Sequence, residues 1–332
     1  MPSGGFAGST FGDQIERVYR NVMSNQREFT ANLSVAYVTP IPGSDPAVKN
    51  PTLTMTGSQA QSIQIGSILA VDEEVFLVQA VSVTTATIPV YTVTVTPAYE
   101  GSTNANHASG TTVYINPKYT RWAIAVALND ALAAMSAPGM GLMREGYTTI
   151  TFNPVLRGYD LAAAGVPSDF HSILSLSYDL PDPTHYFPVM RSFRVGRGIT
   201  STKIPGGYAL FLNSSAMPGL PMMVAYGAPF FPAVSTTQFM DSTVNADNMA
   251  GCGLPSTALD IPAIRAEIDL TLVREIKRNF TDSQPDMRKA TDVVAGNVMN
   301  SVAGLEQLYQ KRMDEEANRF RNRWPQLKPI GI

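Results

Sequence analysis

The stretch that decides the fold is Leu305-Glu-Gln-Leu-Tyr-Gln-Lys-Arg-Met-Asp-Glu-Glu-Ala-Asn-Arg-Phe-Arg-Asn-Arg-Trp324. Its apolar side chains recur every three or four residues, which predicts an amphipathic helix. The pattern runs back to about Asp286, and Pro325 ends it because proline cannot continue a helix. A straight helix of this extent would be about 55–60 Å long. Its apolar stripe consists of Met287, Val294, Val298, Val302, Leu305, Tyr309, Met313, Ala317, Phe320 and Trp324.

Another helix is predicted directly before the long one. It begins near Asp260 and Pro262, and a short break from Thr281 to Pro285 separates the two helices. Its apolar stripe is formed by Ile264, Ile268, Leu272, Ile276 and Phe280. The end of the chain is therefore expected to be a helix pair followed by a short tail.

Two helices are predicted in the first half of the chain. The first starts at Thr10, because Asp13 three residues later completes a variant of the capping box. Its apolar face is expected to continue from Ile15 through the segment 29–37 and to end at Pro40. The second helix is expected from the Asn116-Pro117 pair, a cap and a proline at the first helical position, to the Pro138-Gly139 stop. Its face carries Trp122, Val126, Asn129 and Leu132.

Two blocks between these helices alternate apolar and polar residues in the way typical of β-strands. The first block lies between Pro51 and Ile115 and carries few charges, which predicts a small β-barrel; its strands are expected at 62–69, 74–78 and 91–96. The second block lies between Gly146 and Val234, and its Pro-rich connections predict a sandwich-like module. Its strands are expected at 147–152, 172–178, 186–190, 208–212 and 222–226, with a turn at Pro205-Gly206-Gly207.

These patterns together predict an α+β protein. A discontinuous helical bundle with a long C-terminal helix carries two inserted all-β modules, one a small barrel and the other sandwich-like. The expected boundaries are 1–50 for the N-terminal helix, 51–116 for the barrel module, 117–145 for the second helix, 146–257 for the sandwich-like module and 258–332 for the C-terminal helix pair and tail.

The composition of the chain disfavours some classes of function. A net charge of −3 argues against a protein whose task is to grip nucleic acid, because that task needs a basic surface. Only 15% of the residues are charged, so much of the surface is uncharged, as in proteins that pack against neighbours. The single cysteine is expected in a reducing cytoplasm, and we expect a soluble protein with no signal peptide and no membrane span.

The residues that could perform chemistry are scattered. His107, His171 and His185 have no metal-ligand spacing, and each is expected to satisfy ordinary hydrogen bonds. Cys252 has no sequence signature of a nucleophile. Asp72-Glu73-Glu74 is expected to be a solvated hairpin, because adjacent strand residues point to opposite faces. No catalytic residue, metal ligand or cofactor site is therefore predicted.

The basic residues near the C-terminus have a structural explanation. Lys311-Arg312 and the arginines between 319 and 323 alternate with acidic residues at the spacing of helical ion pairs. We therefore expect a solvated or subunit-facing charged surface rather than a grip on DNA.

Two local patterns resemble proteins of tailed bacteriophage particles. One sequence motif recurs in small β modules of phage tail and connector proteins. It is resembled here by the stretch Thr96-Pro-Ala-Tyr-Glu-Gly-Ser-Thr-Asn-Ala-Asn-His-Ala-Ser-Gly-Thr-Thr-Val-Tyr-Ile115. The motif more commonly has an Arg-Gly turn where this chain has Glu100-Gly101, while His107 and Gly110 are in place. The helical frame, Tyr119-Thr-Arg-Trp-Ala-Ile-Ala-Val-Ala-Leu-Asn-Asp-Ala-Leu132 with the C-terminal pair, is similar to that of head-to-tail connector (adaptor) proteins. The Tyr-Gly-Ala-Ala run usual in their penultimate helix is absent.

The resemblance implies a structural virion protein without enzymatic activity. Adaptors form rings, commonly of twelve subunits, under the portal protein, where they extend the DNA channel and offer the next tail or neck ring a surface. Such a protein would be made in the host cytoplasm and end in the virion, with viral DNA passing its lumen without specific binding. The resemblance also implies docking to the portal through the C-terminal end, for which the candidates are Trp324, Leu327, Ile330 and Ile332. The same tail composition is also typical of a terminus without fixed structure.

Three other classes stay open. Another phage tail or baseplate structural protein is the first alternative, although the extended C-terminal helices are unusual for β-dominated tube and decoration proteins. A tail-associated hydrolase would need a carboxylate pair in a cleft, and the charge-poor β blocks contain few candidates. A DNA-binding packaging factor would need a basic groove.

Overall fold

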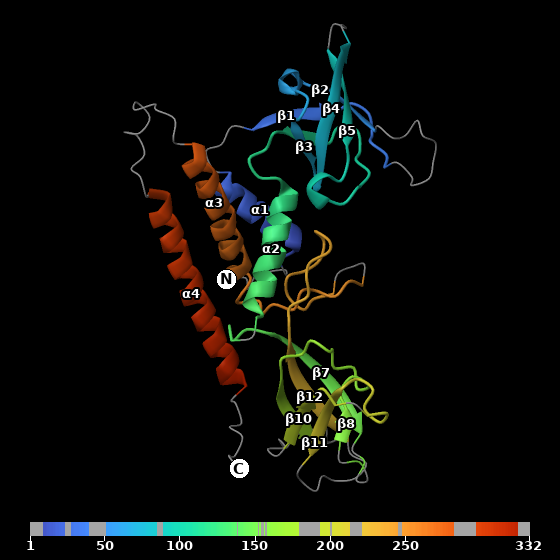
Figure 1. Ribbon diagram of the computed structural model, residues 1–332, viewed down its shortest axis with the longest axis vertical. Helices are drawn as coiled ribbons and strands as arrows, with labels where there is room; N and C mark the ends of the chain where they lie inside the picture. Colours follow the sequence, from blue (N-terminus) through green and yellow to red (C-terminus); the bar gives the residue numbers. More distant parts are fainter. Residues whose placement is uncertain are drawn as a thin grey trace, which may run out of the picture. The chain divides into compact units, whose positions relative to one another are not determined.

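In the residues described by a computed structural model of the chain there are four α-helices and twelve strands. Figure 1 shows these elements. The structure describes residues 9–23, 28–39, 51–84, 89–137, 139–151, 153, 156, 158–178, 193–199, 201–212, 221–244, 248–281 and 297–324. The helices are α1 (Phe11–Val22), α2 (Arg121–Met135), α3 (Ile261–Thr281) and α4 (Asn297–Arg323). The predicted α+β class is confirmed, with its long C-terminal helix and two all-β modules.

The first β module is a closed antiparallel barrel of six strands in the order β1-β2-β5-β4-β3-β6. Period-two alternation creates its core: in β5, for example, Tyr91, Val93 and Val95 are buried while the residues between them are half-buried. Leu53 and Phe76 from neighbouring strands complete this core. The strands are β1 (Phe29–Leu33), β2 (Thr52–Thr56), β3 (Ile68–Val71), β4 (Glu74–Thr84), β5 (Val90–Thr96) and β6 (Thr112–Ile115).

Two sequence predictions around the barrel are wrong. The first helix ends at Val22, and the segment Phe29–Leu33 forms strand β1, where Phe29 pairs with Ile115 of β6. Apolar residues four apart, such as Phe29 and Leu33, share one face of a strand as well as of a helix, and pairing with β6 decides between the two. Of the strand expected at 62–69, the segment 62–67 is no strand: a 3-10 turn over Ala60–Ser62 leads into a loop, and β3 begins only at Ile68.

The predicted start of α1 is confirmed. The Thr10 hydroxyl oxygen accepts the Asp13 N–H at 3.1 Å, and the Asp13 carboxylate accepts the Thr10 N–H at 2.9 Å. The start of α2 differs from the prediction, because Thr120 and not Asn116 caps it, accepting the N–H of Ala123 at 3.1 Å. Asn116 has a positive φ of 47° and instead accepts the N–H of Ile68 in β3 at 2.8 Å. On α2, Val126 is exposed, so the predicted apolar face is only partly right.

The second β module consists of two three-stranded antiparallel sheets, β10-β11-β8 and β7-β12-β9. Both sheets contribute to one apolar core, which contains Ile150, Tyr159, Leu176, Leu210 and Val224, so the sandwich prediction is confirmed. The strands are β7 (Arg144–Thr151), β8 (Gly158–Asp160), β9 (Ser172–Tyr178), β10 (Phe193–Arg197), β11 (Tyr208–Leu212) and β12 (Pro221–Ala228). The sequence did not predict β8 or β10, and the strand expected at 186–190 lies outside the described residues.

The turn before β11 and the C-terminal helices follow the predictions. Gly207 has a φ of 74°, a conformation that favours glycine. On α3, Ile264 and Ile268 are buried as predicted, while Leu272 is exposed. The break predicted after Thr281 and the segment up to residue 296 lie outside the described residues.

Helix α4 runs without interruption through Gly304, so its 27 described residues span about 40 Å. Its predicted stripe is confirmed at Val302, Tyr309, Met313 and Ala317, all of which are buried. Among the described residues, no helix combines the length and apolar character needed to cross a membrane.

The chain divides into two compact units. One consists of residues 1–13, 129–265 and 287–332 and contains the sandwich and α4; the other consists of 14–128 and 266–286 and contains the barrel. The division falls inside α1, α2 and α3, so these helices contribute residues to both units.

Candidate functional site: the C-terminal end of helix α4

The C-terminal end of α4 is fixed to the first strand of the sandwich. The Trp324 indole N–H donates to a Glu145 carboxylate oxygen at 2.8 Å, and the Arg323 guanidinium lies 3.2 Å from the other oxygen. The Tyr147 hydroxyl donates to the same carboxylate at 3.0 Å, and its ring centroid lies 6.4 Å from that of Trp324. One carboxylate on β7 therefore binds Arg323, the last residue of the helix, and Trp324, which follows it.

The predicted docking residues thus separate into two groups. Trp324 is half-buried, and its polar atom already has a partner within the chain. Leu327, Ile330 and Ile332 lie outside the described residues. Glu145 was not among the residues predicted from the sequence, although strand alternation places Glu145 and Tyr147 on one face of β7 and gives the signal for that pair.

A hollow of about 540 Å³ lies beside this anchor. Its rim combines an aromatic ring with two cations: Phe231 is 43% exposed, the Arg144 guanidinium lies 3.9 Å from its ring centroid, and Arg323 lines the same hollow. Leu254 and Pro255 supply apolar lining. The end of α4 therefore borders a surface of mixed aromatic and cationic character.

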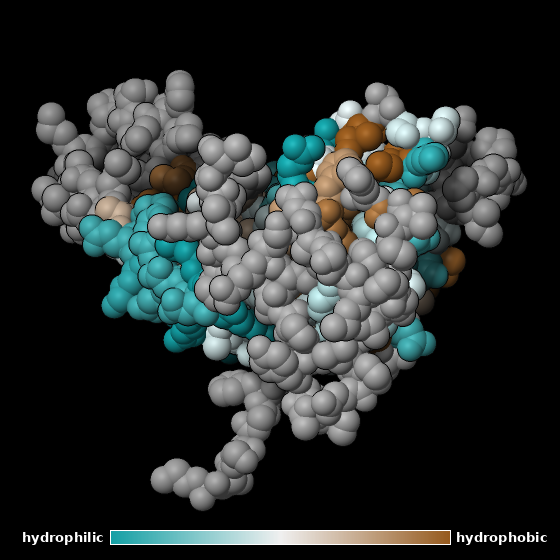
Figure 2. Space-filling view, turned by 90° about the horizontal axis from the view of Figure 1, so that it is seen from below, coloured by the Kyte–Doolittle hydropathy of each residue, from teal (hydrophilic) through white to brown (hydrophobic). Residues whose placement is uncertain are grey.

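Ion pairs neutralise much of the charge along α4. Arg312 donates to both oxygens of Asp260 at 2.9 and 3.0 Å and to Glu315 at 2.7 Å; the hydrogen bonds to Asp260 and Glu315 raise the pKa of Arg312. Glu316 is 2% exposed and accepts from Thr257 at 2.7 Å and Arg319 at 2.6 Å. The interleaving predicted from the sequence is therefore present as ion pairs. Figure 2 shows the hydrophilic side chains gathered over α4 on the left of the view.

The histidines occupy different environments. His107 is buried in the barrel with both ring nitrogens 3.0 Å from carboxylate oxygens, of Asp72 and Glu74. His171 lies 2.7 Å from the carbonyl oxygen of Ser136, and His185 is outside the described residues. The expectation of a solvated 72–74 hairpin is wrong for Glu74, which is 1% exposed. Its charge is tolerated there because His107 and two backbone N–H groups bind it.

Cys252 has the features of a structural thiol. It is fully buried, and burial raises the pKa of its thiol to about 11, so the sulfur stays protonated at neutral pH. Its backbone N–H donates to the carbonyl of Phe239 at 2.9 Å. The residue therefore belongs to the packing of the segment that leads to α3.

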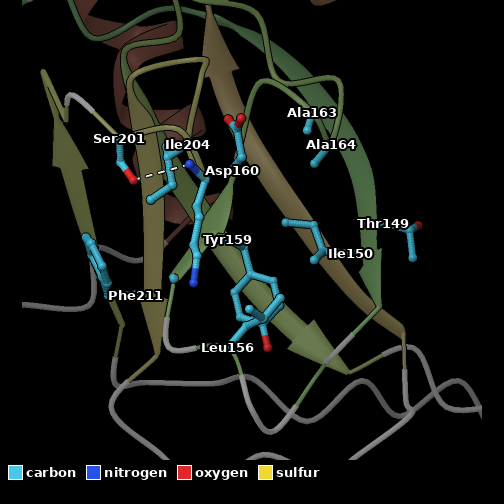
Figure 3. A pocket seen from close by; sticks show the side chains of 12 residues that line it. Thr149, Ile150, Leu156, Tyr159, Asp160, Ala163, Ala164, Ser201, Ile204 and Phe211 are labelled. Carbon is cyan, nitrogen blue, oxygen red and sulfur yellow. Dashed lines mark hydrogen bonds between the residues drawn. The ribbon is translucent and has the colours of Figure 1, made fainter.

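A second cavity of about 720 Å³ opens where edge strands β7 and β8 face each other (Figure 3). Ile150, Leu156 and Tyr159 form its apolar side. Asp160 also lines it, but its carboxylate accepts the N–H groups of Ala162 at 3.0 Å and Gly206 at 3.3 Å. That carboxylate therefore stabilises the neighbouring turns.

Among the described residues, no group of three or more histidine, cysteine, aspartate or glutamate side chains is arranged to hold a metal ion. No protein-family model matches this chain, and no curated protein matches it.

Proposed function

We propose that this protein is a subunit of the head-to-tail connector of a tailed bacteriophage, an adaptor that forms a ring under the portal. In this function the ring extends the DNA channel, lets viral DNA pass without specific binding, and offers the next neck or tail ring a surface. The proposal rests on the resemblance in residues 96–115 and in the helical frame. An architecture of helices with two inserted β modules is compatible with it.

The structural observation that carries the proposal is that α4 is packed along one face and anchored at its C-terminal end. One face packs inside its own unit through Tyr309, Met313 and Ala317, and the helix ends at an anchor formed by Trp324 and Glu145. The segment 325–332, with its three large apolar residues, therefore starts from a defined point of the molecule. Burial of three such side chains against a portal would contribute about 1.5–3 kcal/mol each, repeated in every subunit of a ring.

Electron microscopy of particles with a labelled copy of this chain tests the location. We expect symmetric copies at one vertex, between the head and the tail. Label along the tail or at its distal end would favour the alternative of a tail or baseplate protein. Label spread over the whole shell would contradict both assignments.

A truncation tests the docking function of the C-terminal end. Removal of residues 326–332 should leave the melting temperature of the free protein unchanged, while DNA-filled heads lose the protein and fail to join tails. The matched control keeps the length and replaces Leu327, Ile330 and Ile332 with serine; it should fail in the same way if apolar burial is the cause. Normal yield of complete particles with either variant would exclude the tail as the docking element.

A further inference from the structure

His107 is enclosed by the wall of the barrel. It is 4% exposed, and its backbone pairs with that of Tyr37 through hydrogen bonds of 3.0 and 2.8 Å. Its ring packs against two aromatic rings, with centroid distances of 6.0 Å to Tyr37 and 5.9 Å to Phe76, which also contact each other. Water is therefore largely excluded from the imidazole, and its hydrogen bonds depend on protein groups.

Both ring nitrogens face carboxylates. Nδ1 lies 3.0 Å from an Asp72 oxygen, and Nε2 lies 3.0 Å from a Glu74 oxygen. An ionised carboxylate only accepts hydrogen bonds, so both contacts are hydrogen bonds when both nitrogens carry protons, as in the imidazolium ion. Burial lowers the pKa of His107, but hydrogen bonds to Glu74 and Asp72 and the charges of both outweigh burial and raise it.

The other carboxylates nearby favour the same charge state, the protonated ring. Glu73 lies in the turn between Asp72 and Glu74, and Glu100 lies in the loop 97–106, whose backbone Glu74 binds; both are acidic. Burial and the charge of Glu74 raise the pKa of Tyr37 to about 12, so its hydroxyl stays neutral while a histidine titrates. Burial and the charge of Asp72 raise the pKa of Glu73, while the nearby cation Arg121, on α2, lowers it.

Glu74 connects this cluster to the loop 97–106 between β5 and β6. One of its oxygens accepts the N–H of Ala98 at 3.2 Å, near the start of the loop, and the other accepts the N–H of Ala105 at 2.8 Å, near its end. Within the loop, Ala98 and Glu100 have φ angles of 52° and 57°, which are unfavourable for residues other than glycine. The loop is therefore held in a strained conformation by a carboxylate that itself depends on His107.

We propose that protonated His107 is a latch that keeps the loop 97–106 closed on the barrel and releases it when the ring loses its proton. In the neutral ring one nitrogen faces a carboxylate without a proton between them, and Glu74 keeps a buried charge without a cation. The open loop then has the lower free energy, because hydration and relief of backbone strain stabilise it more than the contact with Glu74 stabilises the closed loop. This inference concerns the barrel alone and does not rest on the proposed function.

The direction of the pH effect follows from the raised pKa. A group whose pKa is higher in the folded than in the unfolded protein contributes its full stabilisation below the unfolded value, about 6.5 for histidine. That contribution is lost as the pH rises through the folded pKa. The loop is therefore closed below about pH 6.5 and opens as the pH rises through the raised pKa of His107.

Trp122 provides a signal for the opening, because its indole N–H donates to the carbonyl oxygen of Glu100 at 3.2 Å. The chain has two tryptophans, so a Trp324→Phe background leaves Trp122 as the single emitter. Its fluorescence is followed from about pH 5 to 10, which covers the ordinary histidine pKa of about 6.5 and the values above it. Amide exchange at Ala98 and Ala105, corrected for intrinsic rates, is measured in parallel.

We expect one fluorescence transition, together with a loss of protection at Ala105 of at least about tenfold, as for one hydrogen bond to a charged group. His107→Gln should show the alkaline signal throughout, and His171→Gln should titrate like the parent chain. Asp72→Asn is the second test, because the Asp72 side chain is 59% exposed and Asn tolerates its positive φ. Loss of one carboxylate should move the midpoint to lower pH. An unchanged midpoint in Asp72→Asn, or a normal transition in folded His107→Gln, would overturn the latch.

Discussion

The barrel and the sandwich each show six strands, but they hold their loops by different means. In the barrel, the buried carboxylate Glu74 accepts two loop N–H groups and is balanced by His107. In the sandwich, the Asp160 carboxylate also accepts two turn N–H groups, but it is only half-buried. Other loop contacts there go to backbone carbonyl groups: Thr148 donates to Ala164, and Arg197 donates to Phe170 and His171. From this difference we expect the stability of the barrel to depend on the protonation state of His107, and that of the sandwich to depend mainly on its apolar core.

The largest effect is expected from Glu74→Ala. The change leaves the His107 cation and the N–H groups of Ala98 and Ala105 without their buried partner, which should lower the free energy of unfolding by about 3–5 kcal/mol near neutral pH. Urea denaturation measures the loss. Glu74→Gln keeps an acceptor for the N–H groups and should lose less. A loss below about 1 kcal/mol in Glu74→Ala would show that the charge cluster does not stabilise the barrel.

The matching change in the sandwich is Leu210→Ala. Leu210 is fully buried in the shared core of both sheets, so its truncation should lower the free energy of unfolding by about 2–4 kcal/mol. This loss should be equal at mildly acidic and alkaline pH, because no titrating group is involved. The loss in Glu74→Ala should shrink on the alkaline side, where His107 is neutral. Equal pH dependence of the two variants would remove the distinction between the modules.

The smallest effect is expected from Arg197→Ala. Its guanidinium donates to the carbonyl oxygens of Phe170 at 2.9 Å and His171 at 2.7 Å and lies 4.6 Å from the Phe170 ring centroid. Because the residue is exposed, water replaces these contacts, and the loss should be about 1 kcal/mol. Thermal unfolding against Arg194→Ala, another exposed arginine over an aromatic ring, is the measurement. A loss that varies with pH would show that charge also matters in the sandwich.

At the candidate site, features set by neighbouring residues could be predicted from the sequence, and contacts between residues far apart in the sequence could not. The sequence predicts that α4 ends at Trp324, because Pro325 follows it. It does not predict that Glu145 binds Trp324 and Arg323, because that contact joins residues 179 positions apart. Alternation in β7 places Glu145 and Tyr147 on one face, yet only packing of α4 against the sandwich determines what covers that face.

By itself, the sequence determined the features that depend on neighbours along the chain. These are the Thr10 cap, the buried stripe of α4 and the alternation of β5, since helix periodicity, capping and strand alternation are local. Tertiary structure alone decided that Phe29–Leu33 is a strand and that Glu74 is buried. The physical reason is that a short apolar segment fits either secondary structure until a partner strand satisfies its backbone. A carboxylate enters a core only where folding brings a cation and N–H groups to it.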